Sequence, residues 1–230
     1  MLVQKFPLTT FQQNTRVVVC EKTATAICID PAEKSQDVIN FIKDNNYNLQ
    51  AITLTHGHLD HVGGTKGMAE AFPQVEILLH KDDEDLYYGL PEQPLRMGLP
   101  KFALSSLGMD YDAPPALTRN WVDGENYKVG KLNFRVLHCP GHTRGHVVLA
   151  EESERAVFVG DCLFEGSIGR TDLPGGDYDQ LIESITTRIM TLGDDFTVYS
   201  GHGRETTIGR ERFSNPFLRG GAQIGKGRFV

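Results

Sequence analysis

The sequence predicts an α/β protein in which β-sheets pack face to face and helices cover them. Short apolar and β-branched runs typical of buried strands come in groups, and helical patterns fall between the groups. This order fits packed sheets with helical cover better than a strictly alternating parallel sheet. With 230 residues, 40% of them hydrophobic, the chain can bury one large core, so we expect a single domain. The expected strands are 15–20, 24–29, 51–55, 75–79, 132–137, 147–150, 156–159 and 196–199.

Two segments, 36–45 and 179–192, have the 3.6-residue apolar period of amphipathic helices. Asp177 together with Gln180 is expected to cap the second helix. The apolar faces consist of Val38, Ile39 and Ile42 in the first segment and of Leu181, Ile185, Ile189 and Leu192 in the second.

Two other segments lack a regular period. The segment 89–115 is rich in Pro, Gly and Leu, and we expect a long irregular loop over the functional site, with a lid and an ordinary packed excursion as equal alternatives. The glycine-rich segment 219–230 predicts a tail that is disordered or artificially appended. The expected domain is therefore 1–218.

The composition argues against several classes of function. A formal charge of −7, a pI of about 5.6 and the lack of a long basic run disfavour nucleic-acid binding. The chain has no signal-like start and no run of about 18 apolar residues, so we expect no membrane partner and a cytoplasmic protein. Its four dispersed cysteines favour reduced thiols. For Cys139 and Cys162 we favour small buried residues over reactive or metal-tuning thiols.

A dense cluster of metal-binding residue types follows the strand predicted at 51–55, namely His56, His58, Asp60 and His61. Neither an extended nor a helical backbone would point all four side chains the same way. A turn eased by the neighbouring glycines can instead aim His56 and His58 at one centre and Asp60 and His61 at another. The pattern therefore predicts a two-metal site.

Further metal-binding residues follow other predicted strands beside glycines. His142 lies in the run Cys139-Pro-Gly-His-Thr-Arg-Gly-His146, Asp161 follows Gly160, and His202 lies between two glycines. For the remaining histidines we expect other roles: His146 is a candidate for orienting its neighbours, and His80 and His138 are expected to be surface or packing residues.

Taken together, these motifs resemble the metallo-β-lactamase superfamily. The resemblance runs from about Asp30, in Ile29-Asp-Pro31, to His202, and it implies a four-layer αββα sandwich with the metals at one edge of the two sheets. It also implies the ligand sets: His56, His58 and His142 for one metal, Asp60, His61 and His202 for the other, and Asp161 as the bridge. Zinc is the default for such ligands, with iron or manganese as alternatives.

A site of this kind predicts a hydrolase. Two metals that share a carboxylate can share a water whose pKa falls to near neutrality, and the resulting hydroxide can attack a bound carbonyl. We expect Asp161 to bridge the metals and Asp60 to orient the hydroxide, which makes these two carboxylates the catalytic candidates.

Within the superfamily, the segment 160–176 resembles the hydroxyacylglutathione hydrolases, also called type II glyoxalases. Asp161 stands where β-lactamases commonly carry cysteine, which disfavours penicillin hydrolysis. The resemblance implies a small glutathione thioester such as S-lactoylglutathione as the substrate, bound partly by Arg170. A monomer or small homo-oligomer is expected.

The sequence departs from the better-known glyoxalases at Asp172 and Arg204, where those enzymes have tyrosines. Arg204 is a second candidate for substrate binding, with a plain surface arginine as an equal alternative. Because the chain ends soon after His202, we expect a compact form without the C-terminal helical domain.

Two alternatives to a thioester hydrolase stay open. Through Gly169-Arg-Thr-Asp172 the chain also resembles persulfide dioxygenases, which would use one iron held by His56, His142 and Asp161. The other alternative is a metal-binding module without catalytic activity, which is less consistent with a ligand set of histidine and aspartate that leaves room for water.

Overall fold

The computed structural model describes residues 1–104, 109 and 111–219. All of the expected tail except Arg219, and part of the segment 89–115, therefore lie outside the described residues. In the described part of that segment the expectation of an irregular loop holds only in part, because 90–96 and 101–103 form short helical turns whereas 111–115 have no regular structure. Pro91 and Pro94 occupy first-turn positions of two of these turns, where a missing backbone N–H is tolerated.

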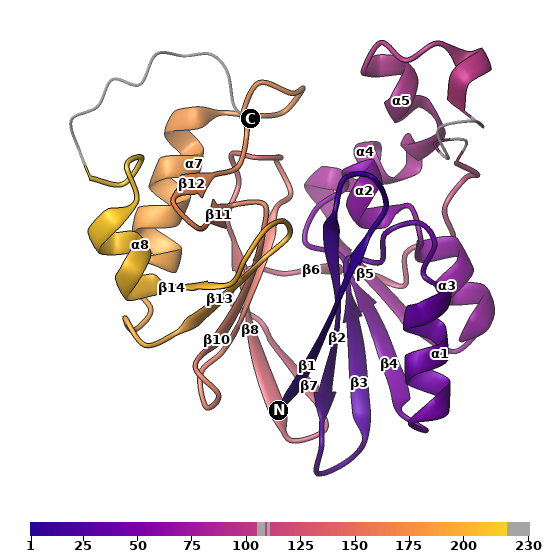
Figure 1. The fold of residues 1–230 in the computed structure, drawn as a ribbon, viewed down its shortest axis with the longest axis horizontal. Helices are drawn as coiled ribbons and strands as arrows, with labels where there is room; N and C mark the ends of the chain where they lie inside the picture. Colours follow the sequence, from indigo (N-terminus) through magenta and orange to yellow (C-terminus); the bar gives the residue numbers. More distant parts are fainter. Residues whose placement is uncertain (105–108, 110, 220–230) are drawn as a thin grey trace.

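Two six-stranded sheets form the centre of the molecule (Figure 1). The first has the order β1-β2-β3-β4-β5-β6, with antiparallel pairing from β1 to β3 and parallel pairing from β3 to β6. Its strands are Leu2–Leu8 (β1), Gln13–Cys20 (β2), Thr25–Ile29 (β3), Asn48–Thr53 (β4), Glu76–His80 (β5) and Arg119–Trp121 (β6).

The second sheet has the order β14-β13-β10-β9-β8-β7. Strands β10 and β13 run parallel, and the other neighbouring pairs are antiparallel. Its strands are Asn126–Val129 (β7), Leu132–His138 (β8), Val147–Glu151 (β9), Ala156–Gly160 (β10), Thr197–Ser200 (β13) and Thr206–Thr207 (β14). A small ribbon of Leu163–Phe164 (β11) and Ser167–Ile168 (β12) follows β10.

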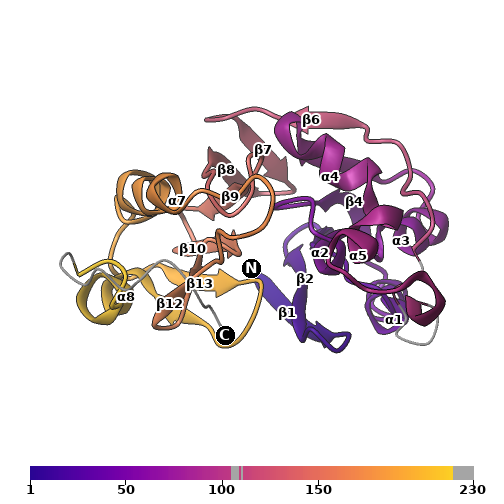
Figure 2. The ribbon, with the colours of Figure 1, turned by 90° about the horizontal axis from the view of Figure 1, so that it is seen from above.

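Helices cover the outer face of each sheet, which confirms the expected four-layer αββα sandwich. Figures 1 and 2 show α1 (Gln36–Asp44) and α3 (Thr65–Ala71) on the outer side of the first sheet. On the outer side of the second lie α7 (Tyr178–Ser184) and α8 (Ile208–Ser214). Short helices lie in connections of the first half: α2 (Leu59–Val62), α4 (Glu84–Tyr88) and α5 (Gln93–Arg96).

Strand β2 shows how one strand contributes to two apolar layers, one between the sheets and one beneath the helices. Its eight residues are all buried, because alternate side chains point to opposite faces and both faces are covered. Val18 packs between the two sheets with Phe134 and Phe158, whereas Val17 and Val19 pack with the helices outside the first sheet. Burying each such side chain stabilises the fold by about 1.5–3 kcal/mol.

The predicted helices occur at the predicted places, with the predicted apolar faces buried. Asp177 caps α7 by accepting a hydrogen bond of 3.0 Å from the backbone N–H of Gln180. One difference is that α7 continues as a π-helical segment, Ile185–Ile189.

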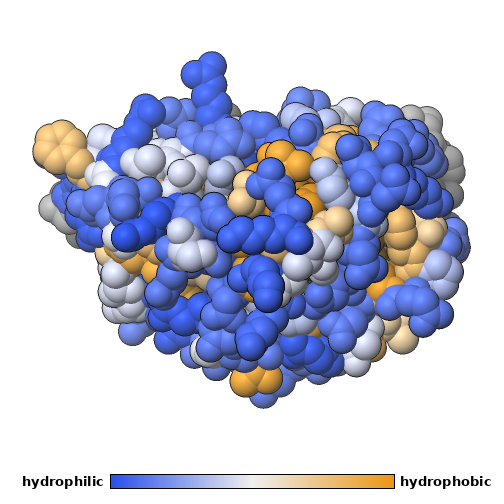
Figure 3. Space-filling view, turned by 90° about the horizontal axis from the view of Figure 1, so that it is seen from below, coloured by the Kyte–Doolittle hydropathy of each residue, from blue (hydrophilic) through white to orange (hydrophobic). Residues whose placement is uncertain are grey.

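Hydrophilic residues cover most of the face shown in Figure 3, with hydrophobic residues in small separate groups. Among the described residues, no helix combines the length and the apolar character needed to span a membrane.

Candidate metal centre

The candidate residues meet at one edge of the sandwich, where strands from both sheets end. His56 follows the end of β4 and His58 precedes α2, in the first sheet's half of the molecule. His142, Asp161 and His202 follow the ends of β8, β10 and β13 in the second sheet. Loops that are far apart in the sequence therefore point their side chains toward one another.

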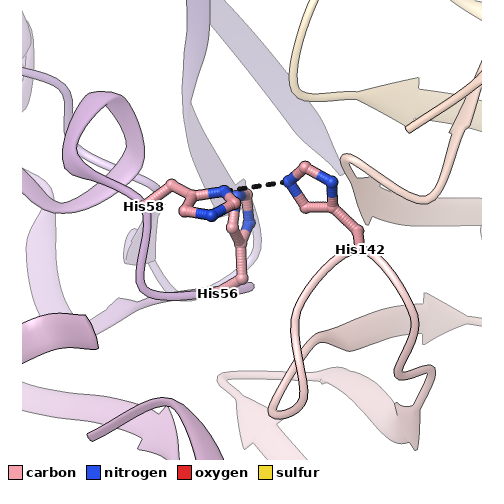
Figure 4. Close-up of side chains that lie close together, drawn as sticks. All are labelled: His56, His58 and His142. Atoms are coloured by element: carbon pink, nitrogen blue, oxygen red, sulfur yellow. Dashed lines mark hydrogen bonds between the residues drawn. The ribbon is translucent and has the colours of Figure 1, made fainter. Parts of the chain in front are cut away.

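His56, His58 and His142 form a first group whose ligand-type atoms lie within 4.8 Å of one another. Figure 4 shows His142 reaching from its own loop toward the loop that carries His56 and His58. Nδ1 of His58 lies 3.0 Å from Nε2 of His142. Their nitrogen atoms therefore converge on a shared point, as the ligands of one metal ion do.

Asp60, His61 and His202 form a second group under the same 4.8 Å limit. Oδ2 of Asp60 lies 3.1 Å from Nε2 of His202 and 3.7 Å from Nε2 of His61. The loop at 56–61 thus sends His56 and His58 to one group and Asp60 and His61 to the other.

The carboxylate of Asp161 lies between the two groups. Its Oδ2 is 3.8 Å from Nε2 of His142 in the first group and 3.5 Å from Nε2 of His202 in the second. Its Oδ1 is 3.4 Å from Nε2 of His61. One carboxylate is therefore within reach of both groups.

Four of the five histidines in the two groups are oriented in the same way by hydrogen bonds from Nδ1. His142 donates to the carbonyl of Arg170 at 2.7 Å, and His202 donates to the carbonyl of Phe11 at 3.0 Å. His61 donates to Asp30 at 2.9 Å, and His56 to the Thr55 hydroxyl at 3.0 Å. Each ring therefore turns Nε2 toward the centre, as metal-binding histidines do when the other nitrogen is bonded.

The buried atoms at the centre lack partners within the described residues. Nε2 of His56, Nε2 of His61 and Oδ1 of Asp161 are buried and make no hydrogen bond. Such atoms destabilise a protein unless something satisfies them. A cation at each group would do so, so the donor set fits divalent metals.

Protonation differs between the two groups. Burial is the largest cause that lowers the pKa values of His56, His58 and His142, to about 3 for His58, so these imidazoles are neutral. Burial also lowers the pKa of His61, but the carboxylates of Asp161, Asp60 and Asp30 outweigh it and raise this pKa well above its ordinary value. The second group thus attracts positive charge.

Glycine is required at two positions beside the centre. Gly160 has a φ of +48° at the shift of register between β10 and β13, and a Cβ there would collide with Thr55 and His146. A Cβ at Gly201 would collide with Oδ1 of Asp161 and with Cε1 of His61. Both glycines allow the strand ends to come close together.

Asp30, at the end of β3, supports the centre in a way that the sequence alone did not reveal. It is 2% exposed and accepts hydrogen bonds from the backbone N–H and the hydroxyl of Thr55, at 2.7 and 2.6 Å, as well as from His61. In the sequence, Ile29-Asp-Pro31 is part of a family motif, but the spacing of Asp30 from His61 gives no signal of this contact.

Asp83 was missed altogether. It lies at the end of a 3-10 turn, Lys81–Asp83. In the sequence it belongs to a run of acidic residues, a pattern typical of an exposed surface. In the structure it is completely buried and accepts hydrogen bonds from two loops of the centre, at Gly57 and at Thr143 and Gly145.

His146 lies beside the centre, as expected of an orienting residue. Its Nε2 accepts a hydrogen bond of 3.1 Å from the backbone N–H of Asp161, and its ring stacks on His56 with centroids 4.9 Å apart. Cys162 and Cys139 are fully buried, and burial raises the pKa values of both thiols, to about 12 for Cys139. These cysteines act as small buried residues rather than reactive thiols.

His80, Asp82 and His138 are a third set of ligand-type side chains, away from the centre. The two imidazoles stack with centroids 4.2 Å apart and planes 14° apart, so their in-plane lone pairs do not converge on one ion. We therefore assign them packing roles.

The two arginines proposed for substrate binding are exposed. The guanidinium of Arg170 forms a bidentate pair with Asp172, through Nε to Oδ1 at 2.7 Å and Nη2 to Oδ2 at 2.9 Å. The backbone carbonyl of Arg170 accepts a hydrogen bond from Nδ1 of His142, which fixes the backbone at this residue. The backbone carbonyl of Arg204 accepts a hydrogen bond from Ser200 at 3.3 Å.

Comparison with known proteins identifies the family. The sequence profile of the metallo-β-lactamase superfamily matches residues 8–202, which is most of the chain. The chain belongs to the metallo-β-lactamase superfamily. The sequence-based recognition of this superfamily is thus confirmed, and the clusters of histidine and aspartate are those of a metallo-hydrolase fold that binds divalent metals.

This superfamily member resembles proteins that are described in different ways. It is 42% identical over 221 residues to hydroxyacylglutathione hydrolase GloC of Haemophilus influenzae, covering 95% of this chain and 98% of that protein. BLEG-1 B3 metallo-β-lactamase has a TM-score of 0.82 at 32% identity, covering 95% of this chain and 100% of the other. TTHA1623 in a di-iron-bound form has a TM-score of 0.80 at 34% identity, covering 94% and 100%.

Proposed function

We propose that the protein is a two-metal hydrolase that cleaves glutathione thioesters such as S-lactoylglutathione into a hydroxy acid and glutathione. The observation that carries this proposal is the position of Asp161, within 3.8 Å of histidines of both groups. The similarity to GloC, at 42% identity over nearly the whole of both chains, supports the choice of substrate.

In the proposed site, His56, His58 and His142 would hold the first metal, Asp60, His61 and His202 would hold the second, and Asp161 would contact both. Zinc is the proposed ion, because histidine and carboxylate ligands suit it. Iron is the main alternative, since a structure that is 34% identical is described as di-iron-bound. Two bound ions would supply a hydroxide nucleophile at neutral pH and polarise the carbonyl of the substrate.

The residues of the chain have separate tasks in this reaction. The hydrogen bonds at Nδ1 fix the tautomer of four of the five rings, so that Nε2 presents a lone pair to the centre. Asp60, the partly exposed carboxylate of the second group, lies beside His61 and His202 and would accept a hydrogen bond from the nucleophile and so orient it. Asp161 holds the two halves of the centre at a fixed separation.

The use of the histidines as proposed metal ligands favours a thioester substrate over an ordinary amide. In the described part of the chain, the histidines of both groups serve as proposed ligands, which leaves none of them to protonate a leaving group. A thiol has a pKa near 8.5, so a thiolate can depart without a proton, whereas an amine cannot. A strained β-lactam is the second candidate substrate class, because BLEG-1 is described as a metallo-β-lactamase.

We also propose a cytoplasmic location. All four cysteines are free and buried, which fits a protein kept in a reducing compartment.

Removal of metal is expected to abolish thioester hydrolysis, and added Zn²⁺ is expected to restore it. The test measures release of free thiol from S-lactoylglutathione by the chelated and the reloaded protein. In parallel, the reloaded protein is assayed with a penicillin, and the iron-loaded protein is assayed for oxygen uptake with glutathione persulfide. Faster turnover of either of those substrates than of any acyl-glutathione would contradict the proposal.

We propose that Arg170 binds a carboxylate of glutathione in competition with Asp172. Arg170→Ala is expected to raise KM by about 3- to 10-fold with little change in kcat, through loss of a charge-assisted hydrogen bond. Asp172→Asn is expected to lower KM by up to about fivefold, since an exposed ion pair contributes at most about 1 kcal/mol. Steady-state kinetics of both variants give the test, and a change in kcat alone would count against this role.

A further inference from the structure

The two loops that carry the first group belong to different halves of the sandwich. His56 and His58 follow β4 of the first sheet, whereas His142 follows β8 of the second (Figure 4). Three nitrogen atoms from these loops have to stay within a few tenths of an ångström of their places to bind one ion tightly. The structure therefore needs something that fixes the separation of the loops.

Asp83 connects these loops directly. Its Oδ2 accepts hydrogen bonds from the backbone N–H of Gly57, at 2.9 Å, and from the hydroxyl of Thr143, at 2.6 Å. Its Oδ1 accepts a hydrogen bond of 2.6 Å from the backbone N–H of Gly145. Gly57 lies between two residues of the first group, and Thr143 is next to the third.

The environment of Asp83 argues against a role in charge pairing. Its side chain is 0% exposed, and within the described residues its carboxylate accepts hydrogen bonds from uncharged groups. Burial of a carboxylate is unfavourable unless hydrogen bonds replace its water, and here three donors do so. The three hydrogen bonds therefore fix the carboxylate of Asp83 in one position.

The two loops that contact Asp83 have no room for a residue larger than glycine at Gly57 and Gly145. A Cβ at Gly145 would collide with the backbone nitrogen and side chain of Asp83, and a Cβ at Gly57 would collide with Leu86 and make a tight contact with the carbonyl of Asp83. Both loops therefore pack directly against the turn that carries this carboxylate.

We propose that Asp83 is a positioning residue that sets the separation of the His56–His58 and His142 loops and thereby the metal affinity of the first group. This inference rests on the proposed two-metal site, but it does not depend on the substrate. The second group shares the 56–61 loop through Asp60 and His61, but it has no residue on the loop at 142–146, so we expect Asp83 to affect it less.

Asp83→Asn is a suitable test because the two side chains have nearly the same shape. Whichever way the amide is turned, its NH2 faces a backbone N–H, either that of Gly57 or that of Gly145. Asp82→Asn is the matched control, since Asp82 is the adjacent carboxylate, is exposed, and makes no hydrogen bond to either loop in the described structure.

The experiment titrates metal-free protein with Zn²⁺ against a chromophoric chelator and resolves the two dissociation constants. For Asp83→Asn we expect one constant to rise about 10- to 100-fold and the other to change by less than about threefold. Asp82→Asn should keep both wild-type constants. At saturating Zn²⁺, the KM of Asp83→Asn for S-lactoylglutathione should stay within about twofold of the control.

A His202→Gln background weakens the second group and shows which constant has changed. There, Asp83→Asn should still weaken the remaining tight site. Unchanged constants, or equal weakening of both, would overturn the proposal. If Asp83→Asn does not fold, Thr143→Val provides the test, because it removes one of the three hydrogen bonds to Asp83. This variant should weaken the same single metal site. Wild-type Zn²⁺ affinity in Thr143→Val would also overturn the proposal.

A wild-type protein that binds two Zn²⁺ but cleaves no thioester would defeat the proposed function and leave this inference standing. A wild-type protein that binds fewer than two would defeat the two-metal site itself.

Discussion

Asp161→Ala is expected to lower kcat/KM for S-lactoylglutathione at least about a thousandfold while the fold survives. Asp161 is the carboxylate that reaches His142 in the first group and His61 and His202 in the second, at 3.4 to 3.8 Å. Without it the two groups have no shared ligand, so neither the metals nor the nucleophile are held at the right separation.

The fold should survive because the backbone around Asp161 is held by other contacts. Its own N–H donates to His146, and Gly201 N–H donates to the carbonyl of Gly160 at 2.7 Å. Circular dichroism and the assay on the same sample provide the measurement. Asp179→Ala, at an exposed position of α7, is the control and should keep wild-type activity. A folded Asp161→Ala protein with more than a tenth of the wild-type activity would rule out its bridging role.

Asp30→Ala is expected to lower the free energy of unfolding of the metal-free protein by about 3 kcal/mol. The substitution leaves the Thr55 N–H, the Thr55 hydroxyl and Nδ1–H of His61 without their acceptor in a buried place. Because the ring of His61 then loses its orientation, Zn²⁺ affinity of the second group should fall as well.

Urea denaturation of the metal-free proteins measures the first effect. Asp37→Ala, which changes an exposed aspartate in the first turn of α1, should change the stability by less than about 0.5 kcal/mol. Equal stabilities of Asp30→Ala and this control would show that the hydrogen bonds of Asp30 are not needed to hold the centre together.

Local sequence patterns predicted the buried strands well, because their signal does not depend on distant partners. All eight expected strands occur, within about three residues at each end. Strand β1 was missed because Leu2–Leu8 is only partly buried, contains Pro7, and forms a strand through its pairing with β2 at the edge of the sheet. Strands β6 and β14 have three and two residues, too few for any period.

In the candidate site too, local sequence patterns were predictive, whereas contacts between distant residues were not. Glycines beside histidine and aspartate at strand ends drew attention to the residues that the structure brings together. Asp83 could not be found in this way, because its role depends on contacts with Gly57, Thr143 and Gly145, up to 62 residues away along the chain. The ion pair of Arg170 with Asp172 was not predicted either, since the resemblance implied that Arg170 contacts glutathione.

The most direct test of a two-metal thioester hydrolase is to measure activity and metal content on the same sample during stepwise addition of Zn²⁺ to the metal-free protein. We expect hydrolysis of S-lactoylglutathione to reach its full rate only when two equivalents are bound per chain. A full rate at one equivalent, or no hydrolysis of any acyl-glutathione at two, would contradict the account.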